Sequence, residues 1–199
     1  MLSMIDRGQA SPTLRRDVVA MARNSPLVEV RDLFERFIPE AERIKRLGDV
    51  ADRAAILALR GDAGRGRLIF TDNAAAQCKT CHKAGGVGEN VGPDLTKIGT
   101  KYNKAAMLGE ILEPSKTIEP QYATYLLETK DGRVLSGLAV ERTKDGVVLK
   151  DAQGKTVKVA STEIDRLVPQ TRSLMPELLL RDLTAQQVAD LLEFLMSLR

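Results

Sequence analysis

The sequence predicts an α+β fold, in which a mainly helical core is interrupted by a small antiparallel β module and preceded by extra N-terminal helices. Two observations lead to this prediction. Apolar residues recur at helical spacing on both sides of residues 120–170, whereas that stretch contains short β-branched segments separated by Gly turns. The length of 199 residues suits one domain or two small ones.

Residues 1–60 are predicted to form an N-terminal helical segment. Ser-Pro pairs at residues 11–12 and 25–26 each place a cap residue before a proline at the first helical position. The second pair precedes an amphipathic stripe that ends at Pro39: Leu27, Val30, Leu33, Phe34 and Phe37. Another short helix is expected over residues 50–60. The segment contains no candidate ligand, so we interpret it as packing scaffold, and we expect it to be the tail of a preceding repeat domain.

Residues 61–199 are predicted to form the second domain. Helices are expected around residues 65–72 and 103–112, and a last helix begins after Thr184, which forms a capping box with Gln187. The buried stripe of the last helix consists of Val188, Leu191, Leu192, Leu195 and Leu198. We expect the first and last of these helices to touch, although they are far apart in the sequence.

The β module is predicted at residues 120–170. Glycine turns at residues 131–132, 145–146 and 153–154 separate four short segments that are rich in β-branched residues. The strand signal fades near residues 164–168. A small four-stranded antiparallel sheet or partial barrel is the expected structure.

Composition argues against several classes of protein. Lys and Arg number 30 against 27 Asp and Glu, and no basic cluster stands out, so nucleic-acid binding is disfavoured. Aromatic residues are only 4% of the chain and Trp is absent, which also disfavours base stacking. No apolar run approaches the roughly 20 residues of a transmembrane helix, and no signal-type segment is expected at the N-terminus.

The strongest motif is a pentapeptide that contains the entire cysteine and histidine content of the chain: Cys78, Cys81 and His82. Cys-x-x-Cys-His is the attachment signature for one haem c. The two thiols form thioethers with the porphyrin, and the adjacent imidazole ligates the iron. A thioredoxin-like dithiol is the first alternative, but the flanks lack its βαβ setting. A structural zinc site is the second alternative, and it would need four ligands where the chain has three Cys and His residues in total.

The sixth position of the iron either has a second ligand, which has to come from a residue other than His, or is vacant, which would suggest gas binding or catalysis. Among the six methionines, Met175 lies in a non-helical loop and is followed by Pro176, which stiffens the backbone. Met107 and Met196 lie in helical stripes, where methionine is usually a core residue. Met175 is therefore the predicted sixth ligand, and an apolar loop residue is the alternative interpretation.

The order of these motifs resembles class I cytochromes c and, more narrowly, the Pirellula/Verrucomicrobium-type haem-binding domain, which lies at the C-terminal end of large secreted dehydrogenase-like proteins. The matching stretches cover about residues 31–198: RDLFERFIPEAERIKRLGD, GDAGRGRLIF, CKTCHKAGGVGENVGPDLTKIG, EILEPSKTIEPQYATYLLETKDG and SLMPELLLRDLTAQQVADLLEFL. The resemblance implies thioethers at Cys78 and Cys81, with His82 as proximal ligand and Met175 as distal ligand. It also implies that Pro93 offers its carbonyl to the second imidazole nitrogen.

The expected function is one-electron transfer by a monohaem c-type cytochrome domain that is not itself an enzyme. Its expected partner is a redox protein or a dehydrogenase domain that supplies electrons, and its expected location is periplasmic or otherwise exported. A haem sensor or enzyme with an open distal site is the alternative, and a docking module based on the β insertion is a third hypothesis. Four lysines form a candidate docking patch for an acidic partner, and an ordinary solvated surface is the alternative interpretation: Lys97, Lys101, Lys104 and Lys116.

Overall fold

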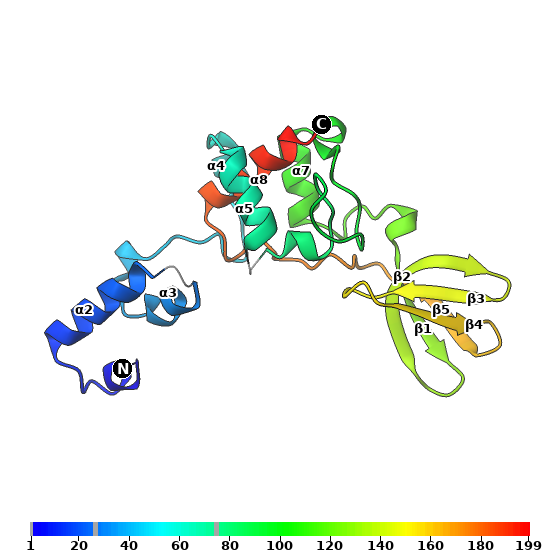
Figure 1. Ribbon diagram of the computed structural model, residues 1–199, viewed down its shortest axis with the longest axis horizontal. Coiled ribbons are helices and arrows are strands. Elements are labelled where there is room, and N and C mark those ends of the chain that lie inside the picture. The colour runs from blue at the N-terminus through cyan, green and yellow to red at the C-terminus, as the bar shows by residue number, and fades with distance from the viewer. Residues whose placement is uncertain (1, 26–27, 74–75) are drawn as a thin grey trace. The chain divides into compact units, whose positions relative to one another are not determined.

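Figure 1 shows the computed structural model of the chain. It describes three stretches of the sequence: residues 2–25, 28–73 and 76–199. Pro26 and Leu27, which belong to the predicted amphipathic helix, lie outside these stretches. Within the described stretches, no helix is long and apolar enough to cross a membrane.

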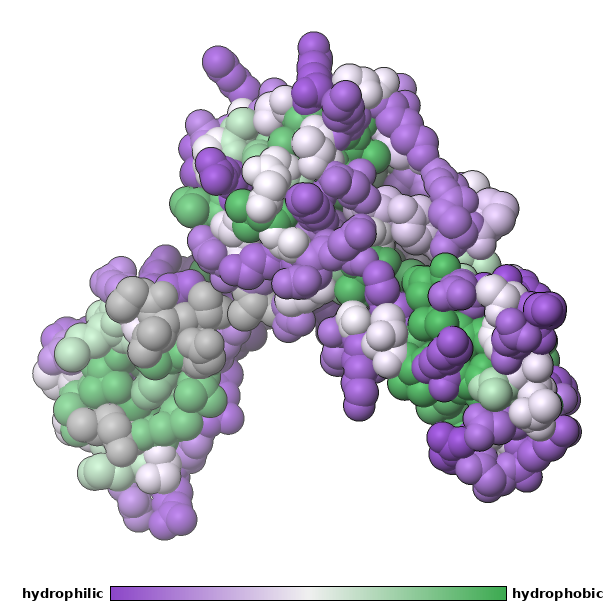
Figure 2. Space-filling view, turned by 45° about the vertical axis from the view of Figure 1, so that its right-hand side comes forward, coloured by the Kyte–Doolittle hydropathy of each residue, from purple (hydrophilic) through white to green (hydrophobic). Residues whose placement is uncertain are grey.

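The chain divides into two compact units, Met1–Lys45 and Arg46–Arg199. Residues 46–60, which the sequence predicts as part of the N-terminal segment, therefore belong to the second unit. The first unit is helical: α1 (Leu2–Asp6), α2 (Pro12–Arg23), α3 (Val28–Glu35) and the 3-10 helix η1 (Glu40–Glu42). Its described residues include only three buried apolar side chains: Ile5, Ala22 and Ile38. Much apolar surface stays exposed on this unit, as Figure 2 shows.

The second unit contains the remaining elements. Its helices are α4 (Arg53–Ala58), α5 (Ala63–Asp72), η2 (Cys78–Thr80), α6 (Ile98–Lys101), α7 (Lys104–Leu112), η3 (Pro120–Tyr122) and α8 (Ala185–Ser197). The capping box of Thr184 and Gln187 is present at the start of α8, as predicted. Most of the predicted stripe of α8 is buried in one hydrophobic core with residues of α4, α5 and α7.

Helices α5 and α8 cross in close contact, which confirms the predicted contact between the first and last helices (Figure 1). The rings of Phe70 and Phe194 lie 5.6 Å apart at an interplanar angle of 52°. The backbones approach so closely at the crossing that a Cβ on Gly66 would lie 1.9 Å from the carbonyl oxygen of Asp190. At Gly61, a Cβ would lie 2.2 Å from the carbonyl oxygen of Ala189. Only glycine permits this crossing.

The buried carboxylate of Asp190 stabilises the same crossing of α5 and α8. Asp190 is 2% exposed and accepts two hydrogen bonds from the Arg65 guanidinium, at 2.7 and 2.8 Å. It also accepts hydrogen bonds from the Asp62 backbone N–H and the Gln186 amide, each at 2.9 Å. Burial raises the pKa of Asp190, but these donors lower it more, and the net pKa lies below the ordinary value. The carboxylate is thus ionised and fully partnered between α5 and α8.

The β module is a five-stranded antiparallel sheet with the strand order β4-β3-β2-β1-β5. Its strands are β1 (Thr124–Thr129), β2 (Val134–Thr143), β3 (Gly146–Lys150), β4 (Thr156–Ala160) and β5 (Ile164–Pro169). One face has its own apolar core, built on Leu127, Val147, Leu149 and Val159. The sheet has one strand more than expected: β5, in the stretch where the signal fades, pairs with β1.

The prediction of a mainly helical cytochrome c core with a minor β insertion is wrong. The structure is only 39% helical, and the sheet is a substantial body with a core of its own. The prediction failed because capping and periodicity locate short helices without revealing how much loop separates them. It also undercounted the strands, since β5 is an edge strand whose pairing with β1 is non-local.

Candidate functional site

The pentapeptide forms a single tight turn. Gln77 adopts the left-handed conformation, with φ 46°, and starts the 3-10 helix η2. The backbone N–H of Cys81 donates to the carbonyl of Cys78 at 3.2 Å, and that of His82 donates to the same carbonyl at 2.9 Å. The two thiols and the imidazole are therefore anchored on one turn of backbone. Both thiols are free, and both side chains are half-buried.

The His82 ring is held on one side by the loop that follows. Its Nδ1 lies 2.9 Å from the carbonyl oxygen of Pro93. Because a carbonyl oxygen only accepts, Nδ1 carries the proton and Nε2 keeps its lone pair. The ring also lies against Gly92, where a Cβ would be 2.8 Å from Cε1 of His82. The geometry thus fixes both the orientation and the tautomer of the imidazole.

Backbone hydrogen bonds tie this loop to the pentapeptide. The N–H groups of Val91 and Gly92 donate to the carbonyl of Cys81 at 3.0 and 2.8 Å. Gly88, with φ +99°, passes so close to the pentapeptide that a Cβ there would lie 2.1 Å from the His82 carbonyl oxygen. Close approach to the pentapeptide therefore requires glycine at residues 88 and 92, whereas at Gly85 and Gly86 glycine is favoured by positive φ alone.

Burial shifts the pKa of two of these groups. The pKa of Cys78 rises to about 11, mainly because burial disfavours the thiolate. Burial also lowers the pKa of His82, and the hydrogen bond to Pro93 opposes that shift only in part. A neutral imidazole is the form that can bind a metal ion, and the lowered pKa keeps His82 in this form at neutral pH.

Met175 lies in the loop between β5 and α8. Its backbone N–H donates to Oγ of Ser173 at 3.1 Å, and the N–H of Ser173 donates to Oγ of Ser115 at 3.2 Å. These contacts tie the methionine loop to the segment after α7. None of these hydrogen bonds joins Met175 to the pentapeptide, so its role as an iron ligand stays a prediction. In contrast, Met107 is 3% exposed and packs in the helical core.

Neither of the alternative interpretations of the two cysteines gains support. A reactive dithiol needs a thiol whose pKa is lowered, whereas burial raises the pKa of Cys78. Across the described stretches, no three His, Cys, Asp or Glu side chains converge as a structural zinc site would require.

Ion pairs neutralise most of the candidate lysine docking patch. Lys101 pairs with Glu119, while Lys104 pairs with Glu193 at 2.6 Å. Lys116 pairs with Glu113 at 3.5 Å. Three of the four lysines thus have an acidic neighbour, which weakens the case for this patch as an attractor of acidic partners.

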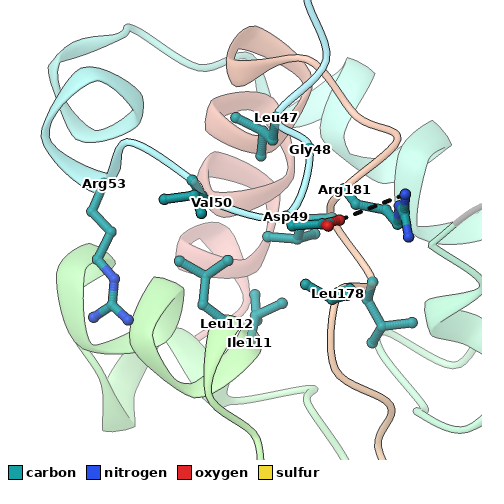
Figure 3. A pocket seen from close by; sticks show the side chains of 12 residues that line it. Leu47, Gly48, Asp49, Val50, Arg53, Ile111, Leu112, Leu178 and Arg181 are labelled. Atoms are coloured by element: carbon teal, nitrogen blue, oxygen red, sulfur yellow. Dashed lines mark ion pairs between the residues drawn. The ribbon is translucent and has the colours of Figure 1, made fainter.

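A pocket of about 270 Å³ opens elsewhere in the second unit (Figure 3). Its walls are the segment Leu47–Arg53, the end of α7 at Ile111 and Leu112, and the loop Leu178–Arg181. Arg181 and Asp49 form an ion pair of 3.5 Å beside it. The five predicted haem-binding residues are not part of its lining, so this pocket is separate from the candidate site.

Sequence reasoning assigned no role to several residues that shape the site. Gly88 and Gly92 belong to a glycine-rich loop that is visible in the sequence, and this composition is the signal that indicates close packing. Val91, which is 6% exposed, and Lys150, from the β module, carried no signal because their contacts are non-local.

No protein-family model matches the chain, and no curated protein matches it. The evidence for function therefore comes from the residues of the site themselves.

Proposed function

We propose that the chain binds one haem c covalently and carries single electrons. The observation that carries this proposal is the arrangement of His82 on the same turn as Cys78 and Cys81, with its Nδ1 bonded to the Pro93 carbonyl. A ring held at Nδ1 presents Nε2, and a carbonyl partner at Nδ1 raises the basicity of an imidazole ligand. When bound, haem supplies an iron that alternates between the ferrous and ferric states.

The residues of the chain fit that group. Cys78 and Cys81 supply the two thioether positions, and the chain contains no other histidine that competes with His82. Cys78 packs against the helical core, as do Leu95, Ile98 and Tyr102, and this apolar core provides low-dielectric surroundings. Met175 is the proposed second ligand, and it would close the iron to substrates, as a carrier requires.

Attachment of haem to this motif takes place outside the bacterial cytoplasm, so the proposed location is periplasmic or otherwise exported. The proposed electron donor is a dehydrogenase, either a separate protein or a further domain.

The deciding experiment is expression of the chain in bacteria that export it and contain a haem c attachment system. We expect the intact mass to increase by one haem, and the haem to remain attached after denaturation. Cys78→Ser and Cys81→Ser should each leave a single thioether, which shifts the reduced pyridine–haem absorption band. A wild-type chain that is exported and folded but gains no haem mass would contradict the proposal.

The carrier role is tested separately with carbon monoxide. A ferrous protein whose iron has two ligands from the chain should bind carbon monoxide slowly and weakly. Rapid, tight binding would favour the alternative function, a sensor or enzyme with an open distal site.

A further inference from the structure

The β module reaches the loop that holds His82. Lys150, the last residue of β3, donates from Nζ to the backbone carbonyl of Asn90 at 3.0 Å. Asn90 directly precedes Val91, Gly92 and Pro93, the three residues that connect the loop to Cys81 and His82. A strand residue is thus bonded to the loop three positions before the carbonyl that orients the imidazole.

A second contact joins the same two segments. The turn between β3 and β4 packs on Val91: a Cβ on Gly154 would lie 3.4 Å from Cγ2 of Val91. Val91 is 6% exposed although it lies in a loop. Burial of a valine at such a position stabilises the loop by removing apolar surface from water.

The turn itself is rigid. The Asp151 carboxylate accepts hydrogen bonds from the backbone N–H groups of Gln153, at 3.0 Å, and Lys155, at 2.8 Å. The backbone N–H of Asp151 donates to the carbonyl of Lys155 at 3.0 Å, and that of Gly154 donates to the carbonyl of Asp151 at 3.0 Å. Four hydrogen bonds restrict the conformation of this turn, so the neighbouring loop packs against a well-defined surface.

We propose that the β module is a clamp on the proximal ligand: Lys150 and the β3–β4 turn hold residues 90–93 in place, and these in turn fix the orientation of His82. Lys150 and Val91 are then positioning residues that act through Gly92 and Pro93. The expected effect of the clamp on the iron rests on the proposed function. The clamp itself concerns only contacts within the polypeptide.

The consequence has a defined sign. A strong hydrogen bond from Nδ1 makes the imidazole a better donor, which favours ferric iron and lowers the midpoint potential. Loosening the loop weakens that bond, so the midpoint potential should rise. Loss of a nearby positive charge alone acts in the opposite direction, because it removes a charge that disfavours ferric iron.

The test uses two variants of the full chain that break different contacts. Lys150→Met removes the donor and Val91→Ala removes apolar contact without changing charge. In both, the protection factor of the Gly92 amide against hydrogen exchange should fall roughly five- to tenfold. Lys150→Arg, which keeps a cationic donor, should restore protection. Lys158→Met, on an exposed position of β4, should leave it unchanged.

The midpoint potential is the second readout. It distinguishes a change in the orientation of His82 from a general loss of stability. Val91→Ala should raise it, whereas Val188→Ala, a buried substitution in α8, should lower global stability without moving the potential. Wild-type protection of Gly92 in both Lys150→Met and Val91→Ala would overturn the clamp. If the chain acquires no haem, the proposed function fails alone, because the exchange experiment needs no haem.

Discussion

Replacing Gly66 with alanine tests whether the α5–α8 crossing holds the helical part of the second unit together. A Cβ at this position would lie 1.9 Å from the Asp190 carbonyl oxygen and 2.8 Å from Cβ of Phe194, whereas real Cβ atoms keep at least 3.0 Å. The helices must therefore separate by about 1 Å at their closest point. The obstacle is backbone, which cannot rotate away as a flexible side chain can.

The magnitude follows from two opposing effects. Overpacking against a rigid partner costs about 3 kcal/mol, at the upper end of the usual range. Alanine in place of glycine inside a helix returns about 1 kcal/mol of helix propensity. We therefore expect a net loss of about 2 kcal/mol in the free energy of unfolding, which for a domain of this size lowers Tm by roughly 4–8 °C.

Gly109→Ala is the matched control, because Gly109 lies inside α7 and nothing lies within 4 Å of the position that a Cβ would take. Without a clash, only the propensity gain remains, and this variant should be more stable than wild type by about 0.5–1 kcal/mol. Urea denaturation followed by circular dichroism measures both variants. A Gly66→Ala protein that is as stable as Gly109→Ala would refute the close crossing.

Three further predictions concern the site and its support. Met175→Ala should abolish the near-infrared sulfur-to-iron absorption band of the oxidised haem protein, lower its potential and admit carbon monoxide. The control, Met107→Ala, should keep the band and lose about 2–4 kcal/mol of stability to a core cavity; an intact band in the Met175 variant would remove Met175 as ligand. Because the folded pKa of Asp190 is depressed, its stabilisation is present above the unfolded pKa of about 4 and is lost as pH falls through the folded value. Asp190→Asn should therefore have a lower free energy of unfolding than wild type at pH 7, and that free energy should fall less steeply as the pH is lowered. An unchanged dependence on pH in the acid range would contradict the ionised state of Asp190. Because the pKa of His82 is lowered, the chain without haem should lose stability as pH falls below about 6.5, and His82→Gln should remove that dependence in thermal unfolding.

Local signals predicted local structure well. The capping box at Thr184 and Gln187 forms as expected, because its two hydrogen bonds connect residues only three apart. The glycine turns between strands also lie where the sequence places them, since a turn is decided by a few neighbouring residues. The pentapeptide needed no structure to be recognised, because its chemistry is contained in five consecutive positions.

The proportion of helix to sheet and the number of strands were not predictable in the same way. Strand β5 carries a weak signal because its place at an edge of the sheet depends on pairing with β1, which lies far away in the chain. The local signals accordingly predict a mainly helical core, and that prediction is wrong.

The sequence by itself determined the candidate site residues: two thiols and one imidazole, concentrated on one turn by their spacing. Only the tertiary structure decided how that imidazole is supported. The Pro93 carbonyl at Nδ1 is implied by a family resemblance, but the contacts of Val91 and Lys150 join the loop to the β module and leave no pattern in the sequence. The physical reason is that spacing along the chain encodes the geometry of a single turn, whereas the packing of one segment on another depends on the whole fold.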